Sequence, residues 1–536
     1  MVPRPVRSRR KHVIRLLAVP VTLALASVIG VRASPPAAAG DDASTSGADA
    51  LARYERQTLT WHDCHGADGD ETGAALDAVG AQCTDVTVPL DYARPAGRTI
   101  TVAVARRTAT DPAHRLGTLL VNTGGPGPSL DGVLAVARGI PPVIPHGSPA
   151  VAARYDLVGM DPRFFGRSTP LECGWPTGNF VGSANGAAVD RRSFDHSVML
   201  AKDLAARCAG LRDRLPHAST RNVARDMDVV RSVLGEKRIS YLGWSYGTYL
   251  GAVYMQLFPG RAQRVVLDSA VDPATWGPSP LRVTGAAAAT AGLRDWASWA
   301  ALRPGRYGLG STTGQVLATV DSVRETAARR PLPVGQHRIT AAMLPGLLLT
   351  AVDSDEAYAA FSAKVRVLRD AARGVATAPT PDLEEYLDLL ASADVTPAFW
   401  FSAGTALRCA DRAASRNPET YWYDIHAHRA DEPFYGPLTR NITPCAFWPT
   451  DPAEPATVVR NDARALIVGA SGDPSAPYPG QLALHRALTG SRMVTLRDAY
   501  LHGVYLFAGN PCVDTTVDRY LLDGASPTTD TACVRR

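Results

Sequence analysis

Residues 239–251 constrain the fold of this 536-residue chain more than any other stretch. They run Ile-Ser-Tyr-Leu-Gly-Trp-Ser-Tyr-Gly-Thr-Tyr-Leu-Gly. The first half is β-branched and aromatic, whereas residues 249–258 carry apolar side chains at helical spacing, so the pattern predicts a strand, a sharp turn and a helix. In such a turn the central serine is exposed in strained backbone geometry, and strand and helix nearly touch on either side of it. Gly243 and Gly247 provide the necessary space around Ser245.

Strands alternate with helices on both sides of this turn. The β-rich runs 84–90 and 99–106 predict an antiparallel hairpin, and the apolar runs 117–122 and 155–161 predict strands buried on both faces. A helix should follow Ser219 and Thr220, because apolar residues recur there at helical spacing. Further strands are expected at 264–268, 464–469 and 492–496, and further helices at 480–488 and 513–522. This alternation predicts the α/β class, with a mostly parallel, doubly wound sheet.

Residues 273–457 interrupt the alternation. Alanine- and leucine-rich stretches joined by proline-rich loops predict helices at 282–302, 339–352, 355–374, 382–392 and 397–412. We interpret the segment as a large helical insertion, or lid. The expected division is a signal peptide (1–39), a disordered leader (40–55), the first part of the core (56–272), the lid (273–457) and the C-terminal part of the core (458–536).

The N-terminus has the layout of a secretory signal peptide. A basic start precedes the apolar run 16–31 and then small residues up to Ala39, near which we expect cleavage. The alternative is a retained anchor, although the run is short for a spanning helix. We expect a secreted protein that does not associate with the membrane after processing.

The positive charge of the chain is confined to this N-terminal segment. Formal net charge is +5, with 56 basic and 51 acidic residues, but seven of the basic residues lie among the first 39. Without these seven, 49 basic and 51 acidic residues remain. A nucleic-acid partner therefore has no electrostatic support.

Eight cysteines in an exported chain predict disulfides. They form four local couples in sequence order, and we expect pairing within each couple: Cys64, Cys83, Cys173, Cys208, Cys409, Cys445, Cys512 and Cys533. A metal site is the rival interpretation, but no C-x-x-C or H-x-x-x-H spacing favours it. We expect neither a metal nor a cofactor.

An exposed serine becomes a nucleophile only beside a base, which in turn needs a carboxylate to orient it. In a doubly wound sheet these groups lie at the carboxyl ends of strands. His502 directly follows the last expected core strand, whereas His485 lies inside a predicted helix. Asp473 follows the preceding strand and is favoured as the acid over Asp268, because the chain order Ser, Asp, His fits the hydrolase plan.

Backbone donors for a developing oxyanion should come from two places. One is the N–H of Tyr246, immediately after the nucleophile, and the other is Gly125 in the glycine-rich loop after strand 117–122. Asp161 is expected to be a structural turn residue that pairs with Arg163.

These motifs resemble those of the secreted actinobacterial tripeptidyl aminopeptidases, α/β-hydrolases related to the prolyl aminopeptidases. Residues 122–129 are similar to the family's N-P-G-G-P-G-G-S, and residues 161–168 to its D-P-R-G-x-G-x-S. Residues 224–235 and 243–251, the Asp473-Pro474 loop, Cys409 and Cys445 also match. Departures occur at Thr123, Pro128, Leu130, Phe164, Phe165 and Leu501. We expect the departures around the oxyanion loop to affect which substrate is bound more than the reaction that is catalysed.

The resemblance implies a serine exopeptidase that acylates Ser245 with the N-terminal portion of a peptide. Such an enzyme needs a lid carboxylate for the free α-amino group, and the candidates are Asp411, Glu384 and Glu385. One alternative is an esterase or amidase that acts on small acyl substrates with the same three residues. Another is a catalytically inactive binding protein. The oligomeric state stays open.

Overall fold

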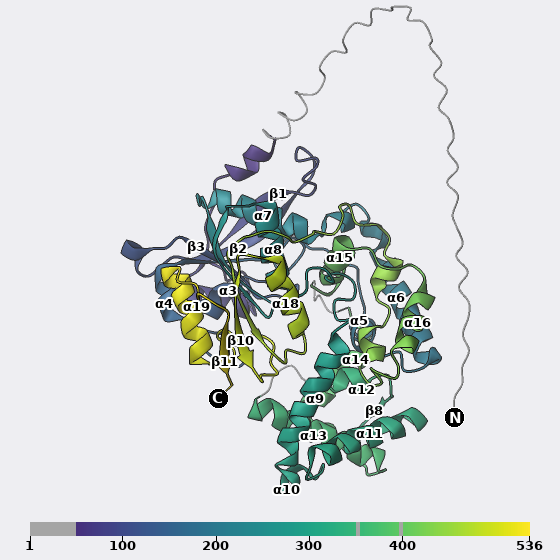
Figure 1. Ribbon diagram of the computed structural model, residues 1–536. Coiled ribbons are helices and arrows are strands. Elements are labelled where there is room, and N and C mark those ends of the chain that lie inside the picture. The colour runs from purple at the N-terminus through teal and green to yellow at the C-terminus, as the bar shows by residue number, and fades with distance from the viewer. Residues whose placement is uncertain (1–49, 350–353, 396–399, 536) are drawn as a thin grey trace, which may run out of the picture. The chain divides into compact units, whose positions relative to one another are not determined.

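A nine-stranded sheet lies at the centre of the protein (Figure 1), seen in a computed structural model that describes residues 50–349, 354–395 and 400–535. The strand order is β1-β2-β4-β3-β5-β6-β9-β10-β11. The strands are β1 (Gln82–Pro89), β2 (Thr99–Arg107), β3 (Thr118–Asn122), β4 (Asp156–Met160), β5 (Ile239–Trp244), β6 (Ala262–Asp268), β9 (Leu466–Ala470), β10 (Arg492–Arg497) and β11 (Thr531–Val534). β2 pairs antiparallel with β1 and β4, and the other neighbours pair parallel. The predicted α/β class and the predicted hairpin are confirmed.

Helices cover both faces of the sheet, which explains why β3, β4, β5 and β9 are buried at every residue. Leu119 and Leu242 pack with α3 (Gly132–Ala137), α4 (Pro149–Arg154) and α19 (Pro511–Asp523). Leu120 and Tyr241, each one position away, pack on the opposite face with α7 (Thr220–Val233), α8 (Tyr246–Leu257) and α18 (Tyr478–Ala487). Side chains of a strand alternate between faces, so an apolar strand supplies both cores.

The lid has a hydrophobic core of its own. Its elements are α9 (Gly285–Ala301), α10 (Pro304–Tyr307), α11 (Thr313–Arg329), β7 (Leu332–Val334), β8 (His337–Ile339), α12 (Leu344–Leu347), α13 (Asp355–Ala372), α14 (Pro381–Ala391), α15 (Trp400–Asp411), α16 (Pro418–Ala427) and α17 (Gly436–Thr439). The helix expected at 339–352 is wrong over most of its described length: residue 339 ends β8 in a hairpin with β7, and α12 holds only four residues, with Pro345 in its first turn.

Part of the segment that connects β4 to α7 packs against the lid. α5 (Thr177–Asn185) and α6 (Arg191–Arg207), which lie between β4 and α7, were not expected as helices. The amide of Gly178 in α5 donates to the carbonyl of Ser392, just after α14. The cover over the sheet therefore draws on two separate segments of the chain.

Regular structure begins earlier in the chain than expected. Residues 50–55, assigned to a disordered leader, are helical, and Tyr54 is 3% exposed. The Tyr54 hydroxyl donates to the carbonyl of Pro95 in the β1–β2 turn at 2.6 Å, which ties this segment to the hairpin. The expected signal peptide lies outside the described residues.

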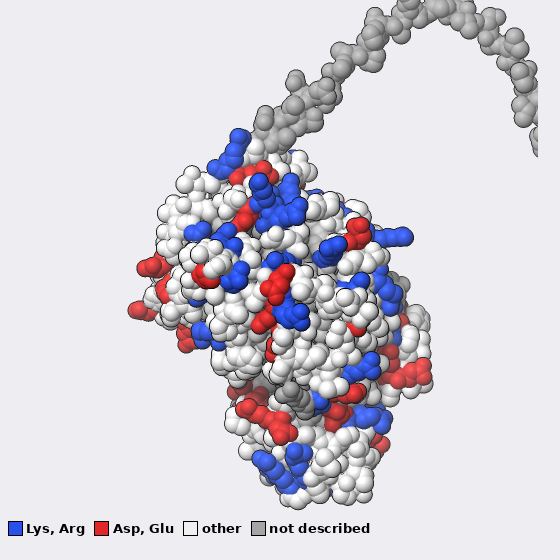
Figure 2. Space-filling view, turned by 60° about the vertical axis from the view of Figure 1, so that its left-hand side comes forward, with Lys and Arg blue, Asp and Glu red and all other residues white. Residues whose placement is uncertain are grey.

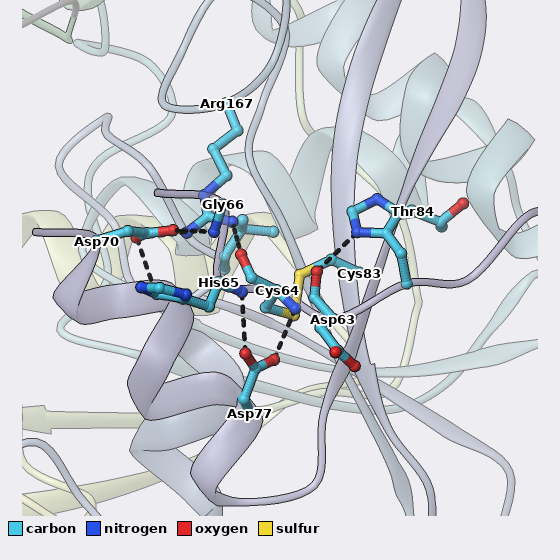
Figure 3. The surroundings of a disulfide bond; sticks show 12 residues. Asp63, Cys64, His65, Gly66, Asp70, Asp77, Cys83, Thr84 and Arg167 are labelled. Carbon is cyan, nitrogen blue, oxygen red and sulfur yellow. Dashed lines mark hydrogen bonds and ion pairs between the residues drawn. A yellow bond between two sulfur atoms is a disulfide. The ribbon is translucent and has the colours of Figure 1, made fainter. Parts of the chain in front are cut away.

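All four expected disulfides are present: Cys64–Cys83, Cys173–Cys208, Cys409–Cys445 and Cys512–Cys533. Figure 3 shows the first of them, beside α2 (Glu71–Ala78). There Arg167 pairs with Asp70 at 2.6 Å and also donates to the carbonyl of Cys64, while Asp77 accepts the amide of Cys64. These bonds fasten the N-terminal segment to the loop after β4.

Charge is distributed evenly over the face shown in Figure 2, where basic and acidic side chains are interspersed. Among the residues that the structure describes, no helix combines the length and the apolar character needed to cross a bilayer.

A fully buried ion pair joins Arg163 to Asp226 of α7. The Arg163 Nη2 and Nε atoms lie 2.6 and 2.7 Å from the two carboxylate oxygens, and both side chains are fully buried. Arg163 also donates to the carbonyls of Pro89 and Leu90, at the end of β1. The Arg163 side chain thereby joins three segments that are distant in sequence.

Replacement of this arginine should destabilise the fold strongly. Arg163→Met leaves Asp226 buried without its counter-charge, and we expect the free energy of unfolding to fall by about 3 to 5 kcal/mol in urea denaturation. The control is Arg98→Met, since the Arg98–Asp213 pair of similar length, 2.7 Å, is exposed. That loss should stay below about 1 kcal/mol. Equal losses in the two variants would contradict the argument.

Candidate active site

Ser245 lies at the junction of β5 and α8 in the strained geometry that the sequence predicts. Its φ is 55° and its ψ is −120°, in the left-handed region that L-residues rarely adopt. A Cβ atom at Gly243 would lie 2.6 Å from the carbonyl oxygen of Gly247, so strand and helix can approach this closely only through glycine. Ser245 is partly exposed, whereas its neighbours from 239 to 250 are all buried. The turn therefore lifts one hydroxyl out of the core.

The carboxyl ends of four adjacent parallel strands bring the other candidates to the same edge of the sheet. β5, β6, β9 and β10 are consecutive in the sheet. Asp268 ends β6, while Asp473 and His502 lie in the loops after β9 and β10. Ligand and catalytic groups of open α/β sheets gather at this edge.

The imidazole of His502 contacts Asp473. Its Nδ1 atom lies 3.0 Å from both carboxylate oxygens. Asp473 is fully buried and its Oδ1 atom also accepts the amides of Ser475 and Ala476, each at 2.8 Å. Burial alone disfavours the imidazolium, but the charge and the hydrogen bond of Asp473 outweigh it, so the pKa of His502 is raised above its ordinary 6.5. The ring is held with Nε2 left for another partner.

Asp268, the rival acid, holds the backbone of the same loop. Its carboxylate accepts the amide of Tyr505 at 2.7 Å and that of Val504 at 3.1 Å. Burial, together with the nearby charge of Asp473, raises the pKa of Asp268 to about 7, although these backbone bonds and His502 oppose the shift. Asp268 therefore positions the loop that carries His502, and Asp473 is the carboxylate on the ring.

The glycine-rich loop after β3 lies against the serine. A Cβ atom at Gly124 would lie 3.1 Å from the Cβ of Ser245 and 2.6 Å from the carbonyl oxygen of Trp244. The Gly124 amide donates to the side chain of Asn122, and Gly125, the residue predicted to bind an oxyanion, follows it in the loop. Tyr246 opens α8, where the first N–H groups have no intrahelical partner.

Asp161 supports this loop, and the expected pairing with Arg163 is wrong. The Asp161 carboxylate accepts the amides of Ser129 and Leu130 at 2.7 and 3.1 Å, and that of Arg167 at 2.8 Å. The two neighbours in the motif thus face different partners. Sequence adjacency suggested a pair, whereas the turn directs the two side chains to opposite sides.

The three lid carboxylates proposed for an α-amino group differ in exposure. Asp411 is 6% exposed and accepts bonds from the amide and hydroxyl of Thr220 and from the indole of Trp276. Burial raises the pKa of Asp411 to about 6, and these bonds oppose the rise. Asp411 therefore docks α15 on the start of α7. Glu384 and Glu385 are exposed on α14 and do not line the cavity described next.

A cavity of about 400 Å³ lies beside the Asp473 loop. Its wall includes Pro474 and Ser475 from that loop, and otherwise residues of α5 and of the lid. The charged side chain among the residues that line it is Arg408 of α15. Arg408 belongs to no motif in the sequence, where only its position next to Cys409 distinguishes it. Over the described ranges, no cluster of three or more His, Cys, Asp or Glu side chains is arranged to hold a metal.

Comparison with known proteins agrees with this geometry. Residues 117–291 match the family model described as "alpha/beta hydrolase fold", and residues 432–533 the one described as "TAP-like protein". The tripeptidyl aminopeptidase of Streptomyces coelicolor is 35% identical over 92% of this chain and 89% of its own length. Carboxylesterase B of Mycobacterium tuberculosis is 30% identical over 94% and 95%. The serine protease Hip1 of the same organism is 28% identical over 85% and 87%.

The protein is an α/β-hydrolase, and its chemistry is that of a serine hydrolase. Within that class the chain belongs to the tripeptidyl aminopeptidase family, a family of peptidases. The alternative of a catalytically inactive binding protein is set aside.

The raised pKa of His502 predicts the pH at which activity is lost on acidification. Because the base must be neutral to accept a proton, kcat/KM on an activated acyl ester should fall on acidification with a midpoint above pH 6.5. Asp473→Asn removes the charge that favours the imidazolium, so the midpoint should move to lower pH while the rate falls by about 10⁴-fold. Initial rates between pH 5 and 9 test both. A midpoint that does not move in the variant would contradict the assignment.

Proposed function

We propose that this enzyme is a secreted serine peptidase that releases short peptides from the free N-terminus of its substrates. The observation that carries the proposal is the contact of His502 with Asp473 at the sheet edge where Ser245 stands exposed. The identity of 35% with a tripeptidyl aminopeptidase over 92% of the chain supports the choice of substrate.

The mechanism follows from the positions of these groups. His502 accepts the proton of the Ser245 hydroxyl as its oxygen attacks the scissile carbonyl, and Asp473 stabilises the imidazolium. The amides of Tyr246 and Gly125 bind the oxyanion, each contributing roughly 3 kcal/mol. His502 then protonates the leaving amine, and water hydrolyses the acyl-enzyme by the same route in reverse. No cofactor takes part in the proposed reaction.

Secretion is part of the proposal. Four disulfides within the described residues favour an oxidising compartment, and the N-terminal layout favours export. We retain 273–457 as the lid and 458–536 as the second part of the core, with α5 and α6 as an additional cover contributed by the first part.

Hydrolysis of small acyl esters is the second candidate, and one observation favours it. An aminopeptidase needs an acidic group for the substrate's α-ammonium, yet the residues described around the cavity include no aspartate or glutamate. The 30% identity with a carboxylesterase points the same way.

The nucleophile can be tested by covalent labelling. A fluorophosphonate probe should label the wild type, and Ser245→Ala should abolish labelling and lower kcat on the order of 10⁶-fold. Ser240→Ala is a matched control, because Ser240 lies on the same strand, fully buried and without a hydrogen-bond partner for its hydroxyl among the described residues. It should label as the wild type does. Labelling that survives Ser245→Ala would move the nucleophile elsewhere.

Substrate pairs separate the two candidates. The peptidase proposal predicts cleavage of a tripeptide p-nitroanilide with a free amine, and a drop of at least about tenfold in kcat/KM when that amine is acetylated, since one charged contact is lost. Turnover of p-nitrophenyl butyrate without any cleavage of the free-amine peptide would establish the esterase instead. Rates would be measured by release of the chromophore.

A further inference from the structure

Arg408 is a partly buried cation that has no carboxylate partner, and its guanidinium carbon lies 5.7 Å from the centre of the Trp276 ring. Its Nη2 atom lies 3.4 Å from the carbonyl oxygen of Gly125, at the edge of hydrogen-bond distance, and its Nε atom is buried with no partner. No carboxylate of the described chain forms an ion pair with it. Burial lowers the pKa of Arg408, and the nearby Tyr246 opposes this shift.

The two arginines that are buried in the described chain are both paired. Arg163 has Asp226, and Arg440 binds Glu432 at 2.6 Å and Asp424 at 3.1 Å. A charge taken out of water is costly unless an opposite charge accompanies it. Arg408, which is partly exposed, has no such partner and lies beside the glycine-rich loop that carries Gly125.

The position of Arg408 relative to the chemistry is well defined. One helical turn earlier, Gly404 faces Pro126, whose carbonyl oxygen would lie 3.5 Å from a Cβ atom there. The next residue, Cys409, is bonded to Cys445, which lines the same cavity. Helix α15 is thus held against the Gly125–Pro126 loop on one side and the cavity wall on the other.

The cavity is complementary to an anion. Arg408 is its charged residue among those described, and the hydroxyl of Thr443, also in the wall, is buried with no hydrogen-bond partner in the described chain. A carboxylate accepts hydrogen bonds only, so it would satisfy both groups, whereas an ammonium would be repelled by the guanidinium.

We propose that Arg408 binds a carboxylate of the substrate and thereby selects substrates that carry a negative charge close to the scissile carbonyl. The proposal rests on Ser245 as the nucleophile but holds for peptide or ester hydrolysis alike. The carboxylate has two possible sources: a side chain of the acyl part, or the C-terminal end of a short leaving group.

Matched ester pairs identify the source. The first pair varies the charge on the acyl part and compares p-nitrophenyl hydrogen succinate with its methyl ester. The second pair varies the charge on the leaving group and compares 3-carboxyphenyl butyrate with 3-carbamoylphenyl butyrate. Activated esters report on Ser245 whether or not peptides are cleaved. The ratio of kcat/KM within each pair is then compared between wild type and Arg408→Met, which cancels intrinsic reactivity.

We expect Arg408→Met to lower the charged-to-neutral ratio about tenfold or more in one pair, since a charge-assisted hydrogen bond is lost. Arg408→Lys should recover part of it. Arg412→Met is the control, one residue after the end of the same helix: Arg412 donates to the backbone carbonyl of Trp276 and does not line the cavity, so its ratios should match the wild type.

A purely structural role for Arg408 would lower both rates of each pair equally. Unchanged ratios in Arg408→Met for both pairs would overturn the proposal. Labelling of Ser245 by a fluorophosphonate shows that the variant has folded. Absence of labelling in the wild type would instead refute the proposed nucleophile.

Discussion

The close approach of β5 and α8 at Ser245 is the constraint on which the site depends. A methyl group at Gly243 would lie 2.6 Å from the carbonyl oxygen of Gly247, far inside van der Waals contact. Because helix and strand meet there, the serine takes a left-handed conformation that only tight surroundings can maintain. The loop after β3 and the loop after β10 then have to be arranged around a hydroxyl whose position is already set.

Two buried carboxylates hold those loops, and neither is proposed to take part in the chemistry. Asp161 fixes the loop that carries Gly125, and Asp268 fixes the loop that carries His502. Each accepts backbone amides at a place where no secondary structure supplies a partner. The proposed catalytic groups are thus positioned by side chains that accept the backbone hydrogen bonds that a strand ladder would otherwise accept.

Local patterns predicted the core and four of the five helices expected in the lid, α9, α13, α14 and α15. Strand periodicity, the Ser219 cap and the glycines around Ser245 depend on neighbours in sequence, and the structure agrees with each. The partners of Asp161, the short α12 and the packing of α5 against α14 depend on contacts between distant segments, which no short window contains. The position of Arg408 could not be predicted from the sequence for the same reason. A single arginine in a helix forms no pattern, and only the fold shows that it lines the cavity.

The Cys409–Cys445 disulfide makes the cavity wall dependent on the redox conditions around the protein. Cys445 belongs to the cavity wall, and Cys409 follows the arginine that faces it. In a reducing compartment this wall would be held by packing alone, and its final shape is established when the bond forms. An oxidising environment is therefore a condition for the complete form of the proposed binding site.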